Sequence, residues 1–164
     1  MKQTRNYQQM AAECIAYLVR QSRVTGKPIT GPEEAAQYAA LALVATGDFG
    51  REVVGLLCLN ARNAVLDCRV IAQGTVNQAP VYLREIARAA LFANATGVIL
   101  FHNHPGGHCR PSSEDLALTR QLAEGLRPLD IDLLDHLILA SHEAFSITNG
   151  LAVSFAPPAD DALF

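Results

Sequence analysis

The sequence predicts an α/β domain, a mixed β-sheet with flanking helices, because apolar runs of strand length alternate with segments of helical spacing. The run 53–59 is almost continuously apolar, as in a strand that is buried on both faces. The runs 97–101 and 133–140 are further candidates for strands of the same sheet. With 164 residues, half of them apolar, the chain suits one domain with a substantial core.

Two helices are expected ahead of the sheet. Apolar residues recur at helical spacing over about residues 7–21. The next helix enters at Thr30 or Gly31, and its alanine-rich body runs to Val44 and ends near Gly47. Neither helix carries chemistry that we can identify, so residues 1–48 are assigned as an N-terminal helical segment that packs on the core.

A hairpin and a helix are expected between the first two apolar runs. Residues 65–71 return beside 53–59 as the second strand of the hairpin, and a loop at 74–77 follows. A helix is predicted from Pro80 through Ala93. Its apolar stripe consists of Leu83, Ile86, Ala87, Ala90 and Leu91.

The last part of the chain supplies one more helix and the end of the sheet. The helix is expected from Ser112 to about Leu126. Residues 142–147 are expected to pair with 133–140 as an edge strand. The domain then ends at residue 152, and the proline- and aspartate-containing segment 153–164 is predicted to be a disordered tail.

The stretch from Phe101 to Asp115 carries the chemistry. His102 and His104 leave an apolar strand at positions i and i+2, which places both imidazoles on one face. Proline and glycines then end the strand, and Asp115 follows at the start of the next helix. Two histidines and one carboxylate leave the fourth position of a tetrahedral zinc open for water, which is the pattern of catalytic sites.

Each of these residues also has a simpler interpretation. A buried histidine is usually structural, and Ser112 with Asp115 matches a capping box at a helix start. His108 and Cys109 lie in the intervening loop and are competing candidates for zinc ligation. For Asp135 and His136, a hydrogen-bonded pair in the core or support for a metal ligand is favoured over ligation.

A zinc hydrolase also needs a base that accepts a proton from the attacking water. Glu52 is a candidate because it immediately precedes the buried strand 53–59, which could lie beside the histidine strand. An acid at a strand start is commonly just solvated, and sequence spacing does not select between these two interpretations.

Composition narrows the class of protein. The net charge of −3 gives no overall basic field for nucleic acid, although five basic residues against one acid precede Ile29. Four widely spaced cysteines without a C-x-x-C pair favour reduced thiols in a cytoplasmic protein. No apolar run reaches the ~18 residues of a membrane span, and no signal peptide is apparent, so no membrane association is expected.

The motif His102-x-His104-Pro105 followed by Ser112-x-x-Asp115, with seven residues between His104 and Ser112, resembles the signature of JAMM (MPN-plus) metalloproteases. Further short sequence motifs resemble those of the RadC-like branch of that family: His102-Asn103-His104-Pro105, Pro111-Ser112, Gly74-Thr75-x-Asn77, Arg84-Glu85-Ile86 and Asp135-His136-Leu137-Ile138. The resemblance implies a cytidine-deaminase-like JAB/MPN fold over residues 49–152. It also implies Zn²⁺ held by His102, His104 and Asp115, with Glu52 as general base and Ser112 supporting the tetrahedral intermediate.

The implied activity is that of a zinc-dependent metallopeptidase or isopeptidase acting on a peptide or protein. The alternative from the same resemblance is a DNA repair or recombination accessory, associated with mobile elements. A non-catalytic MPN scaffold is disfavoured because all five site positions are filled. Two departures stand out: Gly106-Gly107 replaces the family's Ser-Gly, and the residues before Glu52 are too few for the helix-hairpin-helix region of longer relatives.

Overall fold

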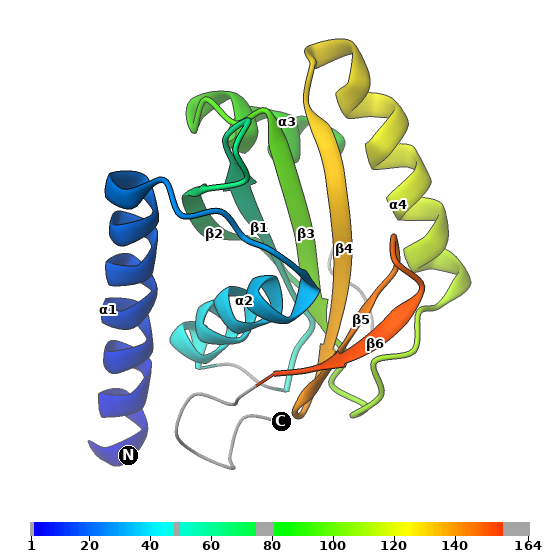
Figure 1. Cartoon of the computed structure of the whole chain (residues 1–164). Helices are drawn as coiled ribbons and strands as arrows, with labels where there is room; N and C mark the ends of the chain where they lie inside the picture. Colours follow the sequence, from blue (N-terminus) through cyan, green and yellow to red (C-terminus); the bar gives the residue numbers. More distant parts are fainter. Residues whose placement is uncertain (1, 48–49, 75–80, 156–164) are drawn as a thin grey trace.

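The computed structural model describes residues 2–47, 50–74 and 81–155, with the backbone alone for residues 2–7. Six strands form one sheet in the order β2-β1-β3-β4-β5-β6 (Figure 1). The strands are β1 Val53–Leu59, β2 Val65–Gln73, β3 Gly97–Asn103, β4 Asp132–Ala140, β5 Glu143–Ser146 and β6 Leu151–Ser154. The helices are α1 Lys2–Thr25, α2 Pro32–Thr46, α3 Leu83–Phe92 and α4 Ser113–Leu126, followed by a 3₁₀ turn at Arg127–Leu129.

The sheet is mixed, as predicted. β3 and β4 are parallel, and α4 connects them, because parallel neighbours need a crossover. All the other neighbouring strands are antiparallel. None of the described helices is long and apolar enough to cross a membrane.

Helices cover both faces of the sheet. The alanine-rich α2 lies in front of the sheet in Figure 1, where its small side chains pack closely on β1, β3 and β4. On the opposite face, α3 and α4 enclose a second apolar cluster with the other side chains of β1 and β3. Both faces of β1 and β3 are therefore buried, which explains why the sequences of these two strands are almost continuously apolar.

Strand alternation assigns the histidines to one of these faces. Val98 and Leu100 of β3 pack in the cluster of α3 and α4, so His102 extends the same row. In the antiparallel register, Val54 of β1 pairs with His102. Glu52, two residues before Val54, therefore lies opposite His104 on this face.

Three details differ from the sequence prediction. In α3, which begins at Leu83, Leu91 is 54% exposed, whereas Ile86, Ala89 and Ala90 are buried. Leu91 lies about 140° around the helix from Ile86, so it cannot share the buried stripe. α1 extends over Lys2–Thr25, and the predicted start at Pro80 and most of the loop 74–77 lie outside the described residues.

The end of the sheet also differs. β5 pairs with β4 as expected, but it is not the edge, because β6 pairs with its other side. β6 runs to Ser154, past the domain end predicted at residue 152, and Val153 is buried in the core. Of the predicted tail, residues 156–164 lie outside the described residues.

Candidate metal centre

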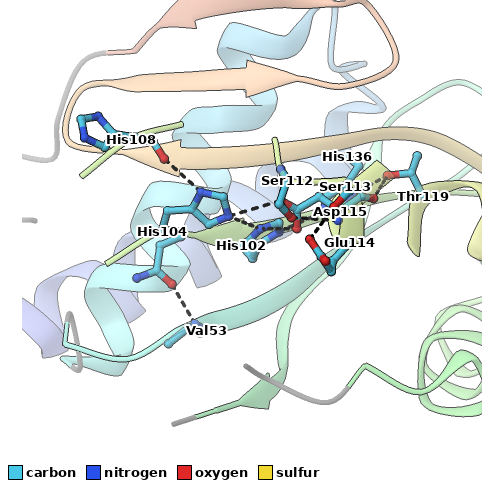
Figure 2. A network of polar contacts seen from close by, with 11 residues as sticks. Val53, His102, His104, His108, Ser112, Ser113, Glu114, Asp115, Thr119 and His136 are labelled. Carbon is cyan, nitrogen blue, oxygen red and sulfur yellow. Dashed lines mark hydrogen bonds and ion pairs between the residues drawn. The ribbon is translucent and has the colours of Figure 1, made fainter. Parts of the chain in front are cut away.

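Three side chains converge where β3 ends and α4 begins. His102 and His104 come from the end of β3, and Asp115 comes from the first turn of α4 (Figure 2). One ligand atom from each of the three side chains lies within 4.8 Å of those of the other two. His102 Nε2 lies 3.0 Å from His104 Nε2 and 3.1 Å from Asp115 Oδ1, and His104 Nε2 lies 3.5 Å from Asp115 Oδ2. The three side chains are positioned to bind a metal ion.

Local sequence brings the chain from the strand to the helix. His104 still donates its backbone N–H to Leu139 of β4 at 3.1 Å, which extends the sheet pairing by one residue. A tight turn follows, in which the Gly107 N–H donates to the His104 carbonyl at 3.0 Å. Gly107 has a φ of 79°, a left-handed conformation that glycine adopts without steric cost.

The capping box at the start of α4 orients Asp115. The Ser112 hydroxyl oxygen accepts from the Asp115 N–H at 3.1 Å, and the hydroxyl donates to Asp115 Oδ2 at 2.7 Å. The Ser112 N–H donates to the same Oδ2, also at 2.7 Å. Asp115 Oδ1 is thereby directed towards His102. Both interpretations of the Ser112–Asp115 pair thus describe one arrangement, a helix cap that also aims a carboxylate.

The donor set suits a cation. His104 Nδ1 lies 3.0 Å from the carbonyl oxygen of His108, and because a carbonyl only accepts, Nδ1 carries the proton. The Nε2 lone pair of a neutral His104 then faces His102 and the Asp115 carboxylate. Electron-pair donors gathered this closely need a positive charge between them, and two nitrogens with one carboxylate oxygen are ligands that Zn²⁺ accepts.

The pKa values at the centre agree with this arrangement. Burial raises the pKa of Asp115, but its contacts with His102 and His104 and the hydrogen bonds from Ser112 outweigh the effect of burial and hold the pKa far below its ordinary value. The hydrogen bond to Asp115 raises the pKa of His104, against the opposing effect of burial. The carboxyl is therefore an anion at neutral pH, and in the metal-free protein a proton competes for the nitrogen that would bind a metal.

Glu52 lies close enough for its charge to interact with those of His102, His104 and Asp115. Burial raises the pKa of its carboxyl, the two histidines oppose this rise, and Asp115 adds to it. The structure thus brings Glu52, predicted from a strand boundary alone, to the same face as the three candidate ligands.

Asn103, which sequence reasoning left without a role, holds the chain on both sides of Glu52. Its Oδ1 accepts from the Val53 N–H at 2.7 Å, and its Nδ2 donates to the Arg51 carbonyl at 3.0 Å. Asn103 is 2% exposed, and a buried amide inside a strand signals a hydrogen-bonding role. That signal was present in the sequence, because Asn103 interrupts the apolar row opposite the histidines.

The remaining candidates lie outside the group of three. Among the described residues, neither His108 nor Cys109 belongs to a set of side chains spaced for a metal ion. His108 is exposed and takes part through its backbone carbonyl. The competing ligation considered from the sequence therefore has no support in the geometry.

The side chains of Asp135 and His136 have different hydrogen-bond partners. The Asp135 carboxylate accepts from Ser146 Oγ at 2.6 Å and from the His136 N–H at 2.7 Å, so it is satisfied within the core of β4 and β5. The His136 ring contacts His102 at 2.9 Å and Thr119 of α4 at 2.7 Å, and burial lowers its pKa to about 3. Thr119 was not singled out from the sequence, although its position four residues after Asp115 puts both on one face of α4.

Comparison with known proteins extends these observations. Residues 29–151 match the family model of the RadC-like JAB domain. The UPF0758 protein RSc2444 of Ralstonia nicotianae is 40% identical over 121 residues, which cover 74% of this chain and 53% of that protein. A UPF0758 protein of Vibrio cholerae is 36% identical over 137 residues, which cover 84% of this chain and 85% of that protein. The UPF0758 protein Smlt0399 of Stenotrophomonas maltophilia is 44% identical over 106 residues, or 65% of this chain and 42% of that protein.

The chain spans about half the length of several of the curated relatives that it matches. The family match nevertheless covers most of the chain, from ahead of α2 into β6. The mixed six-stranded sheet with helices on both faces is consistent with a JAB/MPN fold. The resemblance expected from the sequence motifs is thereby confirmed: the chain belongs to the RadC-like JAB domain family.

Proposed function

We propose that this protein is a zinc-dependent hydrolase that cleaves amide bonds in peptides or proteins. The observation that carries the proposal is the convergence of His102, His104 and Asp115 on the face of the sheet that also holds Glu52. The JAB family assignment makes a hydrolase plausible, and the chemistry below is our inference from these side chains.

In this proposal, His102 Nε2, His104 Nε2 and an oxygen of Asp115 hold the zinc. A bound zinc would lower the pKa of a water towards ~7 and polarise the scissile carbonyl. Glu52 accepts the proton of the attacking water and returns it to the leaving amine. A carboxyl whose pKa is raised by burial suits this work, since it holds a proton more readily than an exposed one.

Two different roles are considered for the Ser112 hydroxyl, orientation of Asp115 and support of an oxyanion. Its hydroxyl proton is donated to Asp115 Oδ2, so orientation of that carboxylate is the role for which contacts are present. Support of a developing oxyanion, as the family resemblance implies, requires the hydroxyl to turn away from Asp115 as the carbonyl is attacked. We propose that Ser112 serves the first role before the substrate arrives and the second during the reaction.

The substrate is proposed to approach over the loop that follows β3. An open pocket between this loop and the β4–β5 turn is lined by residues 107–110 and 140–143. His108, one of its lining residues, contacts His104 through its carbonyl, so the pocket adjoins the candidate ligands. A polypeptide chain lying in this pocket would pass beside the metal centre.

The test is the Glu52→Gln variant, with Glu124→Gln, an exposed acid of α4, as the matched control. The zinc-loaded proteins are incubated with a tryptic peptide mixture and with lysine-linked isopeptide conjugates, and mass spectrometry detects new termini. We expect cleavage by the wild type and by Glu124→Gln. The Glu52→Gln variant should lose at least ~10²-fold in rate while elemental analysis still finds one zinc per chain.

Full cleavage by Glu52→Gln would remove the proposed base. Zinc bound by the wild type without cleavage of either probe would favour a non-catalytic scaffold. Binding to DNA stays a prediction of the sequence resemblance, and the net charge of −3 offers it no support.

A further inference from the structure

We propose that Thr119 and His136 are positioning residues that fix which ring nitrogen of His102 carries the proton, so that Nε2 is free to bind the metal. This inference rests on the proposed metal centre, because it assigns a cause to the form in which one of its ligands is held. Neither residue touches the place where a metal would sit, and both act through His102.

A continuous row of hydrogen-bonded groups connects three elements (Figure 2). His102 Nδ1 of β3 lies 2.9 Å from His136 Nε2 of β4, and His136 Nδ1 lies 2.7 Å from Thr119 Oγ1 of α4. Thr119 Oγ1 lies 2.7 Å from the backbone carbonyl oxygen of Asp115, one turn earlier in α4. The row therefore begins at one candidate ligand and ends on the main chain of another.

The carbonyl at the end of the row determines every proton in it. The Asp115 carbonyl has no hydrogen, so the single hydroxyl hydrogen of Thr119 points at it. The Thr119 oxygen can then only accept from the histidine ring, which means that His136 Nδ1 carries a proton. No other assignment satisfies both contacts of Thr119.

The next step concerns His136, whose ring is 0% exposed. Burial disfavours the charged imidazolium, so the ring holds one proton, at Nδ1, and its Nε2 is an acceptor. His102 Nδ1 must therefore donate to it. A neutral His102 with its proton on Nδ1 presents the lone pair of Nε2 to His104 and Asp115.

Without this row, the imidazole of His102 would be free to hold its proton on Nε2, and that nitrogen could then not bind a metal. His102 is 2% exposed, so no bulk water is available to replace the acceptor on Nδ1. His104 achieves the same form more simply, through the His108 carbonyl. Removal of a group that orients a metal-bound histidine typically weakens metal affinity by roughly 10–100-fold.

The variants are Thr119→Val, which keeps the shape but removes the hydroxyl, and Thr119→Ser, which keeps the hydroxyl. Thr25→Val is the matched control, because Thr25 Oγ1 also donates to a carbonyl four residues earlier in a helix, that of Gln21 at 2.8 Å. Thr25 makes no contact with the centre. Zinc affinity is measured by competition with a chromogenic chelator, and ¹⁵N–¹H correlation spectra of the histidine rings report the proton positions in metal-free protein.

In the metal-free wild type, we expect protons on Nδ1 of both His102 and His136. Thr119→Val should weaken zinc binding by about 10–100-fold and populate His102 with its proton on Nε2. Thr119→Ser should restore both readouts, and Thr25→Val should change neither. If Thr119 only stabilised the helix, Thr119→Val would lower the stability of the protein without moving the protons on the histidine rings.

The spectrum of the wild type alone can overturn the inference, if it shows the proton of His102 on Nε2. The inference can therefore be tested even if the Thr119→Val protein fails to fold. Unchanged zinc affinity in folded Thr119→Val would also overturn it. Absence of hydrolysis contradicts the proposed function but leaves the ring-proton and zinc-affinity readouts intact, so the two failures are distinguishable.

Discussion

At the scale of single residues, the Asp115 carboxylate organises the centre. Its Oδ2 accepts two hydrogen bonds from Ser112, while Oδ1 faces His102. The negative charge that this arrangement preserves raises the pKa of His104. A proton and a metal ion therefore compete for His104 Nε2, and the winner depends on pH.

Zinc affinity should accordingly fall by about tenfold for each pH unit below the raised pKa of His104, since one proton is displaced per zinc. In the metal-free protein, the contribution of His104 to the stability of the fold depends on pH in the opposite direction to zinc affinity. Because the folded pKa exceeds the unfolded value, the His104–Asp115 contact stabilises the fold below the unfolded pKa and is lost as pH rises through the folded one. NMR titration of His104 in folded and urea-unfolded protein measures both values, and a folded pKa at or below the unfolded one would contradict this account.

At the scale of elements, β3 is held by complementary packing against β1. Gly55 of β1 pairs with Phe101 of β3, and the fully buried Phe101 ring covers the space where a side chain of Gly55 would lie. Phe101 packs towards α2, while its neighbour His102 faces α4. Both faces of β3 therefore pack in the core, and His102 extends the row of core side chains on the face covered by α4.

The Gly55→Ala variant should be destabilised by roughly 1–3 kcal/mol, because its Cβ would lie 2.1 Å from Phe101 Cζ and the ring has no free space to enter. Urea unfolding measures this difference. Gly106→Ala is the control, since a Cβ at Gly106 would meet no atom within 4 Å. Equal stability of the two variants would show that the β1–β3 contact can relax, contrary to the close packing described above.

At the scale of the whole molecule, the candidate ligands come from two separate parts of the fold. His102 and His104 belong to the sheet, whereas Asp115 belongs to α4, which covers one face of it. A metal bound by all three would link the sheet to this helix. Because such a site exists only in the folded chain, metal binding would shift the folding equilibrium towards the native state.

Zinc at 1,000 times its dissociation constant should stabilise the fold by ~4 kcal/mol, equivalent to a rise on the order of 10 °C in Tm. His104→Ala should lose this rise, because one of three ligands is missing. His108→Ala should keep it, since His108 takes part through its carbonyl. Calorimetry with and without zinc distinguishes these outcomes, and a lost rise in His108→Ala would reinstate His108 as a ligand.

The sequence predicted those features that depend on neighbours along the chain. The continuous apolar run 53–59 predicted a strand buried on both faces, and Gly47 predicted the end of α2. Spacing alone put His102 and His104 on one face, and the capping pattern put Asp115 at a helix start. The prediction that Leu91 belongs to the buried stripe was wrong, because it inferred burial from an apolar side chain. Burial depends on what packs against the helix, and Leu91 is exposed.

The sequence by itself determined the family, the mixed α/β class and the local geometry of each motif, because propensity, alternation and capping act over a few residues. Only the tertiary structure decided that Asn103 of β3 bonds to the main chain of Val53, next to Glu52, and that His136 of β4 and Thr119 of α4 contact each other. The contacts Val53–Asn103 and Thr119–His136 join residues that are 50 and 17 positions apart along the chain, respectively. Their meeting follows from strand register and from the docking of α4, which the whole core selects and no short stretch of sequence encodes.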